Sequence, residues 1–337
     1  MVSSSQALDI VFDYTYDSGG FFGSAGSDQR LALEEAASFF ETNFGDDLDA
    51  ITPGDGNSWS AVFFDPTNIS SNISVNNLSV AADTMVIFVG SEDRGATNLG
   101  LAAPGGYNVS AVTTGFLTAV TTRGETGMTS GTADDDTDFG AWGGAISFND
   151  NAAIDWNFDA FSEPAPTEYD FLSTALHEIA HVFGFATSES YERLINVSDE
   201  FTGANAVAEN GGVVQLTIDG HIDASEMSTV FGTATSQVPI MSDSSVTGSR
   251  ELMTDSMSRC WKTPAGKSCQ SRVQHCCFSE GVARFCSVGV FAKKKRTSRE
   301  DIHSHLFRQL FSKRSRCQFW NKCGQLASKS RHLLHDS

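Results

Sequence analysis

The chain has 337 residues, and 40% of them are hydrophobic, which is sufficient for one domain with a sizeable core. Its formal net charge of −20 disfavours binding to nucleic acid or to anionic membrane surfaces, because like charges repel. No continuous apolar stretch reaches the length of about 18 residues that a transmembrane helix needs, so we expect no membrane span.

The composition changes abruptly near residue 255. Residues 1–255 contain five basic residues, 38 acidic residues and no cysteine, whereas residues 256–337 contain 17 basic residues, four acidic residues and all seven cysteines. We therefore predict one domain at 1–255 and a basic, cysteine-rich tail at 256–337. Lys293–Arg296 is similar to a nuclear address or a polyanion-binding patch, but the simultaneous change in composition favours a frameshifted or fused reading frame. We expect this tail to be disordered and without function.

In chain order, alternating apolar residues predict a first strand at 7–14. An apolar stripe from Leu31 to Phe44 predicts a helix, with Ser27 as its N-cap and Gly45 at its end. Further strands are expected at 59–64, 84–89 and 143–148, with polar and glycine-containing loops between them. This order predicts an α+β fold with a mixed sheet.

The most informative segment is the His-Glu-x-x-His motif of His177, Glu178 and His181. Thr167–Asp170 is similar to a capping box before this segment, and Gly184 is suited to ending a helix after it. On a helix the two histidines lie one turn apart on the same face, so both can bind one metal ion. Glu178 is displaced from that face, and we assign it the role of general base.

A catalytic zinc site requires three protein ligands and one open coordination position. His221 is the remaining histidine of residues 1–255, and we therefore predict His177, His181 and His221 as the ligands. A second type of zinc site takes its third ligand from a downstream glutamate. The glutamates available for this role are Glu189, Glu192, Glu200, Glu209 and Glu226.

His177-Glu178-x-x-His181-x-x-Gly184 resembles the metzincin clan of zinc metallopeptidases. This resemblance implies a zincin-like fold with a mixed twisted sheet, an active-site helix and a C-terminal subdomain containing a methionine turn. The clan's usual third histidine position holds Thr187 here, whereas the leishmanolysin-like branch displaces that histidine by an insertion, which would place it at His221. The methionine of the turn would be Met241, with Met253 as the weaker candidate.

The chain has an N-terminal strand, a helix from Leu31 to Phe44, a Trp-Gly-Gly strand and a His-Glu-x-x-His-x-x-Gly-Phe helix. These features bear a closer resemblance, covering about Ala7 to Leu252, to secreted bacterial proteins of unassigned substrate. In the metzincin clan, the strand before the active-site helix lies along the cleft and pairs with the substrate. The resemblance implies that this edge strand is Gly143–Phe148, with Gly143, Gly144, Ala145 and Ile146 next to the substrate. It also implies a zinc-dependent endopeptidase in which Glu178 assists the attack of water on a protein or peptide substrate.

Other features complete the expectations. A calcium ion could bind the acidic run Asp134–Asp138, although the run lacks the regular alternation of a calcium-binding loop, and a solvated loop is the competing interpretation. The acidic, cysteine-free body is typical of a secreted protein, but Met1–Gln6 has no signal-peptide character. Either a signal is missing from this sequence, which is the interpretation we carry forward, or the expectation of export is wrong. A monomer is the default expectation. The alternative to a peptidase is a non-catalytic extracellular binding module with the same fold.

Overall fold

The computed structural model describes residues 8–43, 48–124, 140–203, 207, 212–230 and 233–253. All of these lie in the first of two compact units, Met1–Gly289. The predicted tail at 256–337, its boundary with the domain and the candidate calcium loop Asp134–Asp138 lie outside the described residues.

The main sheet has four strands in the order β1 (Asp9–Asp13), β4 (Thr84–Glu92), β7 (Gly143–Asn149) and β5 (Gly100–Pro104). The first three strands are parallel, and β5 runs antiparallel to β7 at the edge. Every residue of β7 is buried, as expected for a strand with a neighbour on each side and both faces covered. The sheet is therefore mixed, and its antiparallel member is an edge strand.

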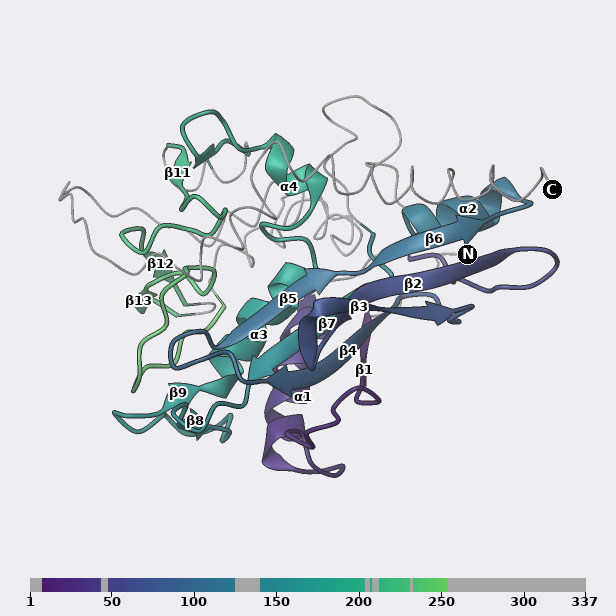
Figure 1. The fold of residues 1–337 in the computed structure, drawn as a ribbon. Coiled ribbons are helices and arrows are strands. Elements are labelled where there is room, and N and C mark those ends of the chain that lie inside the picture. Colours follow the sequence, from purple (N-terminus) through teal and green to yellow (C-terminus); the bar gives the residue numbers. More distant parts are fainter. Residues whose placement is uncertain are drawn as a thin grey trace, which may run out of the picture. The chain divides into compact units, whose positions relative to one another are not determined.

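A second, antiparallel sheet has the order β3 (Asn68–Asn76), β2 (Ser58–Asp65) and β6 (Gly106–Ser110). Only Gly105 separates β5 from β6, so one extended segment contributes an edge strand to both sheets (Figure 1). Along β3, exposed residues alternate with half-buried ones, which is the pattern of a strand that has solvent on one face.

Alternating side chains of the main sheet enter two separate cores. Met85, Ile87 and Val89 of β4 pack in the core that includes α1 (Asp28–Asn43) and α3 (Phe171–Val182). Phe88 faces the other way and stacks on Phe63 of β2, with ring centroids 4.1 Å apart. The main sheet is thus a central layer, with the two helices on one face and the second sheet on the other.

The remaining elements are short. Helix α2 (Thr114–Thr121) follows β6, and α4 (Glu189–Arg193) follows α3. The described residues downstream of α3 form only short elements. The two-residue strands are β8 (Trp156–Asn157), β9 (Tyr169–Asp170), β10 (Glu200–Phe201), β11 (Val214–Gln215), β12 (Ser228–Thr229) and β13 (Ser236–Gln237). Within the described ranges, no helix combines the length and apolar character that crossing a membrane requires.

The mixed α+β class is confirmed, as are the predicted strands at 7–14, 59–64, 84–89 and 143–148 and the helix before Gly45. The sequence patterns missed β3, β5, β6 and α2. Strand β5 has the sequence Gly-Leu-Ala-Ala-Pro, which contains no β-branched or aromatic residue. Its extended conformation depends on pairing with β7, and this pairing is not visible in local sequence.

The predicted position of the edge strand is wrong. Strand β7, with Gly143, Gly144, Ala145 and Ile146, pairs with β4 on one side and with β5 on the other, so its backbone groups are already bonded within the sheet. A Cβ atom at Gly143 or Gly144 would collide with a backbone carbonyl of β4 or β5 respectively. The two glycines therefore allow close packing of adjacent strands, and the edge belongs to β5.

Candidate metal centre

Helix α3 carries both histidines of the motif. Its N-cap is Asp170, whose carboxylate accepts a hydrogen bond from the Ser173 backbone N–H, so the helix begins one turn later than a cap at Thr167 would place it. Buried side chains on α3, including Leu176 and Ile179, anchor it in the core. Gly184 follows the helix with a φ of 102°, a left-handed conformation that favours glycine and ends the helix as predicted.

His177 and His181 point their Nε2 atoms at each other across one helical turn, at a distance of 3.0 Å. Each ring is oriented through its other nitrogen. Nδ1 of His177 lies 2.7 Å from the carbonyl oxygen of Ile240, and Nδ1 of His181 lies 2.9 Å from the carbonyl oxygen of Phe185. Because a carbonyl oxygen can only accept, both Nδ1 atoms carry the proton, and both Nε2 atoms present lone pairs.

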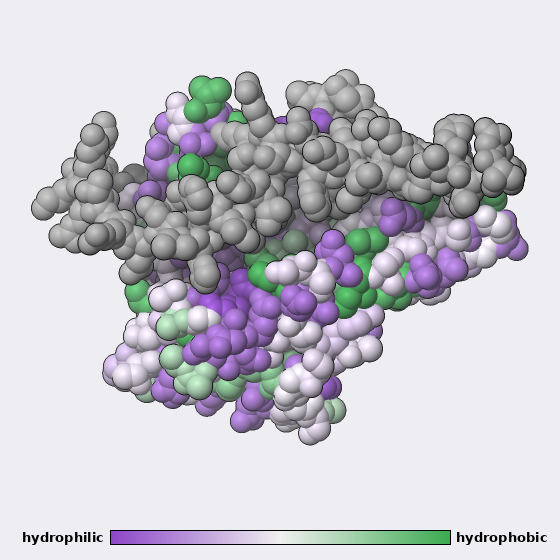
Figure 2. All heavy atoms as spheres, in the orientation of Figure 1, coloured by the Kyte–Doolittle hydropathy of each residue, from purple (hydrophilic) through white to green (hydrophobic). Residues whose placement is uncertain are grey.

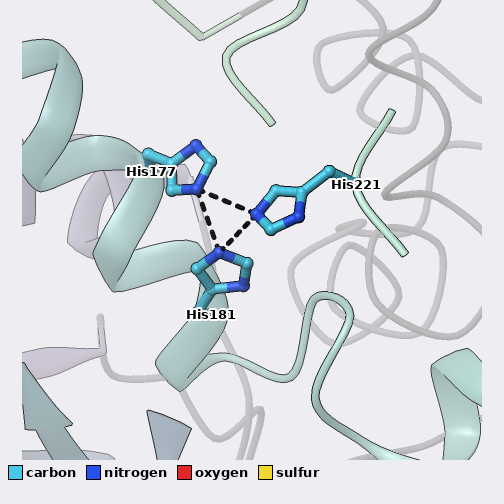
Figure 3. Close-up of side chains that lie close together, drawn as sticks. All are labelled: His177, His181 and His221. Carbon is cyan, nitrogen blue, oxygen red and sulfur yellow. Dashed lines mark hydrogen bonds between the residues drawn. The ribbon is translucent and has the colours of Figure 1, made fainter. Parts of the chain in front are cut away.

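His221 completes the group from the chain segment after β11. Its Nε2 atom lies 3.1 Å from Nε2 of His181 and 3.2 Å from Nε2 of His177 (Figure 3). Its Nδ1 atom lies 3.2 Å from Oδ1 of Asp219 but makes no hydrogen bond of good geometry. The structure thus brings together the three predicted ligands, and within the described residues they form the one group suited to holding a metal ion.

The electrostatics of the cluster favour neutral imidazoles. Burial, followed by the charge of the neighbouring His221, lowers the pKa of His177 to about 3. The hydrogen bond to the Ile240 carbonyl raises this pKa by a smaller amount. Burial, followed by the charges of the other two histidines, also lowers the pKa of His181 well below its usual value. A cation placed among the three nitrogen atoms would be stabilised by their lone pairs, whereas protons on them would repel one another.

Met241 lies in a tight turn, which the Ser242 N–H closes by donating to the Pro239 carbonyl. Its side chain is fully buried in the core that includes α3. On one side of Met241, the Ile240 carbonyl binds His177, and the Met241 carbonyl itself accepts from the N–H of Ile222, the residue after His221. This turn therefore connects two of the three histidines.

Glu178 is buried, with 5% of its surface exposed, and packs against Gly100 of β5. Burial raises the pKa of its carboxyl to about 8, and the nearby Arg94 lowers it in part. Sequence reasoning missed both Gly100 and Arg94. No local motif marks them, because Gly100 reaches Glu178 through the pairing of β5 with β7, and Arg94 is held by hydrogen bonds to Asn149 and Asn98.

The alternative glutamate ligands do not join the cluster. Within the described residues, the metal-binding group contains His177, His181 and His221 and no carboxylate. Glu200 instead accepts hydrogen bonds from Asn196 and Gln215. Glu189, Glu192 and Glu226 are also outside the group, and Glu209 lies outside the described residues.

Comparisons with known proteins found no relative of this chain: no protein-family model matches it, and neither does any curated protein or solved structure.

Proposed function

We propose that the protein is a zinc-dependent endopeptidase of the metzincin type. The observation that carries this proposal is the convergence of three Nε2 atoms, 3.0 to 3.2 Å apart, beside a buried glutamate. Two of the nitrogen atoms come from one helical turn, and the third comes from 40 residues further along the chain. Such a convergence of unprotonated nitrogens needs a cation to be favourable.

The donor set fits zinc. Zinc binds imidazole nitrogen at about 2.0–2.1 Å in tetrahedral geometry, which places neighbouring ligand atoms about 3.4 Å apart. The separations of 3.0 to 3.2 Å among the Nε2 atoms are close to that value. Three imidazoles also leave the fourth coordination position for water or substrate, as in catalytic zinc sites, whereas structural zinc sites are closed by a fourth protein ligand.

In this proposal Glu178 is the general base. Zinc, when bound, lowers the pKa of a coordinated water and polarises the scissile carbonyl. Glu178 takes a proton from the attacking water and passes it to the leaving amine. The contact of Glu178 with Gly100 fixes the direction of the carboxylate. The burial of Glu178 keeps bulk water away from the carboxylate. The Ile240 and Phe185 carbonyls hold two ligand rings in the tautomer that this chemistry needs.

Among the described strands, β5 has no neighbour on the side away from β7, and we infer that substrate binds along this edge. At the two ends of β5, the Gly105 N–H donates to the Gly143 carbonyl, and the Asn149 N–H donates to the Leu99 carbonyl. The backbone groups of the odd-numbered residues therefore face β7. By the alternation of an antiparallel ladder, the N–H and C=O groups of Gly100 and Ala102 face outward. An extended peptide can add to these groups as a further strand. Because Gly100 contacts Glu178, such a peptide would pass beside the proposed base.

The arrangement supports the metzincin type in three respects. A mixed sheet with an antiparallel edge strand lies against the helix that carries the motif. The third histidine lies 40 residues after the second histidine of the motif, as the displaced ligand of the leishmanolysin-like branch would. A methionine lies in a tight turn joined to two of the histidines. Secretion is part of the proposal on the basis of the acidic, cysteine-free composition of residues 1–255, and a monomer is the default.

The test combines metal analysis with proteolysis of unfolded casein. We expect one zinc per chain in both the wild type and Glu178→Gln, and casein cleavage by the wild type alone. Glu163→Gln, which removes an exposed carboxylate, is the matched control and should cleave normally. One zinc per chain without cleavage by the wild type would favour the non-catalytic binding module, and cleavage by Glu178→Gln would contradict the assigned base.

A further inference from the structure

Among the described basic side chains, Arg94 is the one whose charge lowers the pKa of the Glu178 carboxyl. Its Nε atom donates to Asn98, which is two residues before Gly100, and Gly100 contacts Glu178. The other four arginines among the described residues are occupied elsewhere: Arg30 lies over the ring of Tyr14, Arg123 donates to backbone carbonyls, Arg193 pairs with Glu189, and Arg250 pairs with Asp170. Arg94 therefore supplies the positive charge beside the candidate active site.

The guanidinium of Arg94 is held rigidly. Its Nη1 atom pairs with Oε1 of Glu92 at 2.8 Å, its Nε atom donates to Asn98 at 2.7 Å, and its backbone N–H donates to the buried Asn149 at 3.0 Å. Only 7% of the side-chain surface is exposed. Holding a long side chain in one rotamer in this way removes the entropic cost of ordering it when a ligand binds.

One end of this guanidinium is unused. Nη2 of Arg94 makes no hydrogen bond with any described residue, and the protein does not enclose it completely. A guanidinium presents its donors in a planar fork that matches a carboxylate. On the face shown in Figure 2, hydrophilic side chains gather near the end of the sheet where β5 begins. Nη2 is therefore a charged donor available to an incoming group.

The direction of β5 indicates which half of a substrate would meet Arg94. A peptide that adds antiparallel to β5 runs from Pro104 toward Gly100, opposite to the strand itself. After passing Glu178, its C-terminal half leaves the strand at Gly100 and continues toward the segment 93–99. This is the half that departs as the free amine when the peptide bond breaks.

We propose that Arg94 forms a subsite for a carboxylate in the leaving half of the substrate, which selects peptides with Asp or Glu at the first or second position after the scissile bond. This inference rests on the proposed peptidase function. The strongly acidic domain, with 38 acidic and five basic residues before position 256, repels acidic peptides in general. Arg94 would therefore select the position of the acidic residue, and would not favour acidic substrates as a class.

The test uses a series of fluorogenic peptides that are identical except for Asp, Asn or Lys at these two positions. We expect the wild type to favour Asp over Asn by about tenfold in kcat/KM, the size of one charge-assisted hydrogen bond. The Asp/Asn ratio should fall to near one in Arg94→Gln, and it should also fall in Arg94→Lys, because a single ammonium that pairs with Glu92 offers no second donor in the geometry of Nη2. Arg193→Gln is the matched control, and its ratio should equal that of the wild type. Because the ratio is taken within one variant, the amount of folded protein does not affect it.

Two further arms separate the failure of this subsite from the failure of the proposed function. Peptides with free and amidated C-termini distinguish a side-chain carboxylate from a terminal one, and a preference that follows the free terminus would overturn the side-chain assignment. Binding of the Asp and Asn peptides to zinc-loaded Glu178→Gln is measured by fluorescence anisotropy, without turnover. Equal binding of the two peptides, or a preference that survives Arg94→Gln, would overturn the proposal even if the wild type cleaves neither peptide.

Discussion

Gly100 and Glu178 are in direct contact: a Cβ atom on Gly100 would lie 2.5 Å from Oε1 of Glu178. The glycine belongs to β5, and the glutamate belongs to α3, 78 residues later in the chain. No positive φ is recorded for Gly100, so the absence of a side chain, and not backbone freedom, is what this position requires. The carboxylate occupies the space that any other residue would fill.

We therefore predict that Gly100→Ala displaces the Glu178 carboxylate and lowers kcat/KM by about 10- to 100-fold, since a shift of about 1 Å in a catalytic group has effects of this size. Zinc content should not change, because the histidines are untouched. Gly115→Ala is the matched control, since a Cβ there meets nothing within 4 Å. Full activity of Gly100→Ala on casein would show that the position of Glu178 does not matter.

Removal of the metal should destabilise the protein. A ligand that binds only the folded state adds about 4 kcal/mol to the free energy of unfolding at 1,000 times its dissociation constant. We expect a chelator to lower the melting temperature of the wild type, and readdition of zinc to restore it. His221→Ala removes one of the three nitrogen ligands, and its melting temperature should respond weakly to the chelator. An equal response of the two proteins would exclude His221 as a ligand.

The stability of the metal-free protein should depend on pH through Glu178, whose carboxyl has its pKa raised from 4.5 to about 8 by burial. A raised pKa means that the protonated form stabilises the fold below about pH 4.5, and that this contribution is lost as the pH rises through 8. Relative to Glu178→Gln, the wild type should lose up to about 1.4 kcal/mol per pH unit across this window. Denaturant unfolding of both proteins at pH 5 and pH 8 measures the difference. A constant difference would contradict burial of a protonated carboxyl.

The buried ion pair between Arg250 and Asp170 should be essential for stability. Its side chains are 7% and 1% exposed, and the Arg250 Nη2 atom lies 2.7 Å from Oδ1 of Asp170. Asp170 also caps α3, so the pair joins the end of the described chain to the helix that carries two ligands. Arg250→Leu leaves a buried carboxylate without its partner and should cost about 3–5 kcal/mol in unfolding free energy.

The matched control for that substitution is Arg193→Leu. Arg193 and Glu189 form an exposed pair, with a separation of 3.9 Å and side-chain exposures of 49% and 69%. Exposed pairs contribute about 0–1 kcal/mol, so denaturant unfolding should scarcely distinguish this variant from the wild type. Equal costs for the two substitutions would contradict a structural role for the Arg250–Asp170 pair.

Features that depend on neighbouring residues could be predicted before the structure was known. The spacing of His177 and His181 places both on one face of a helix, and Gly184 ends that helix, because these are properties of a few consecutive residues. The strands at 84–89 and 143–148 were also visible as short runs of apolar residues. The motif alone was sufficient to nominate the metal ligands on α3 and Glu178 as the base.

Features that depend on strand pairing and on distant segments became known from the folded structure. It exchanged the predicted edge strand β7 for β5, because strand order is set by long-range packing and not by the composition of one strand. It also brought His221 to within 3.2 Å of both motif histidines and placed Gly100 against Glu178. These contacts join residues 40 to 78 positions apart, and no local pattern records them, since their stability comes from packing that forms only when the chain folds.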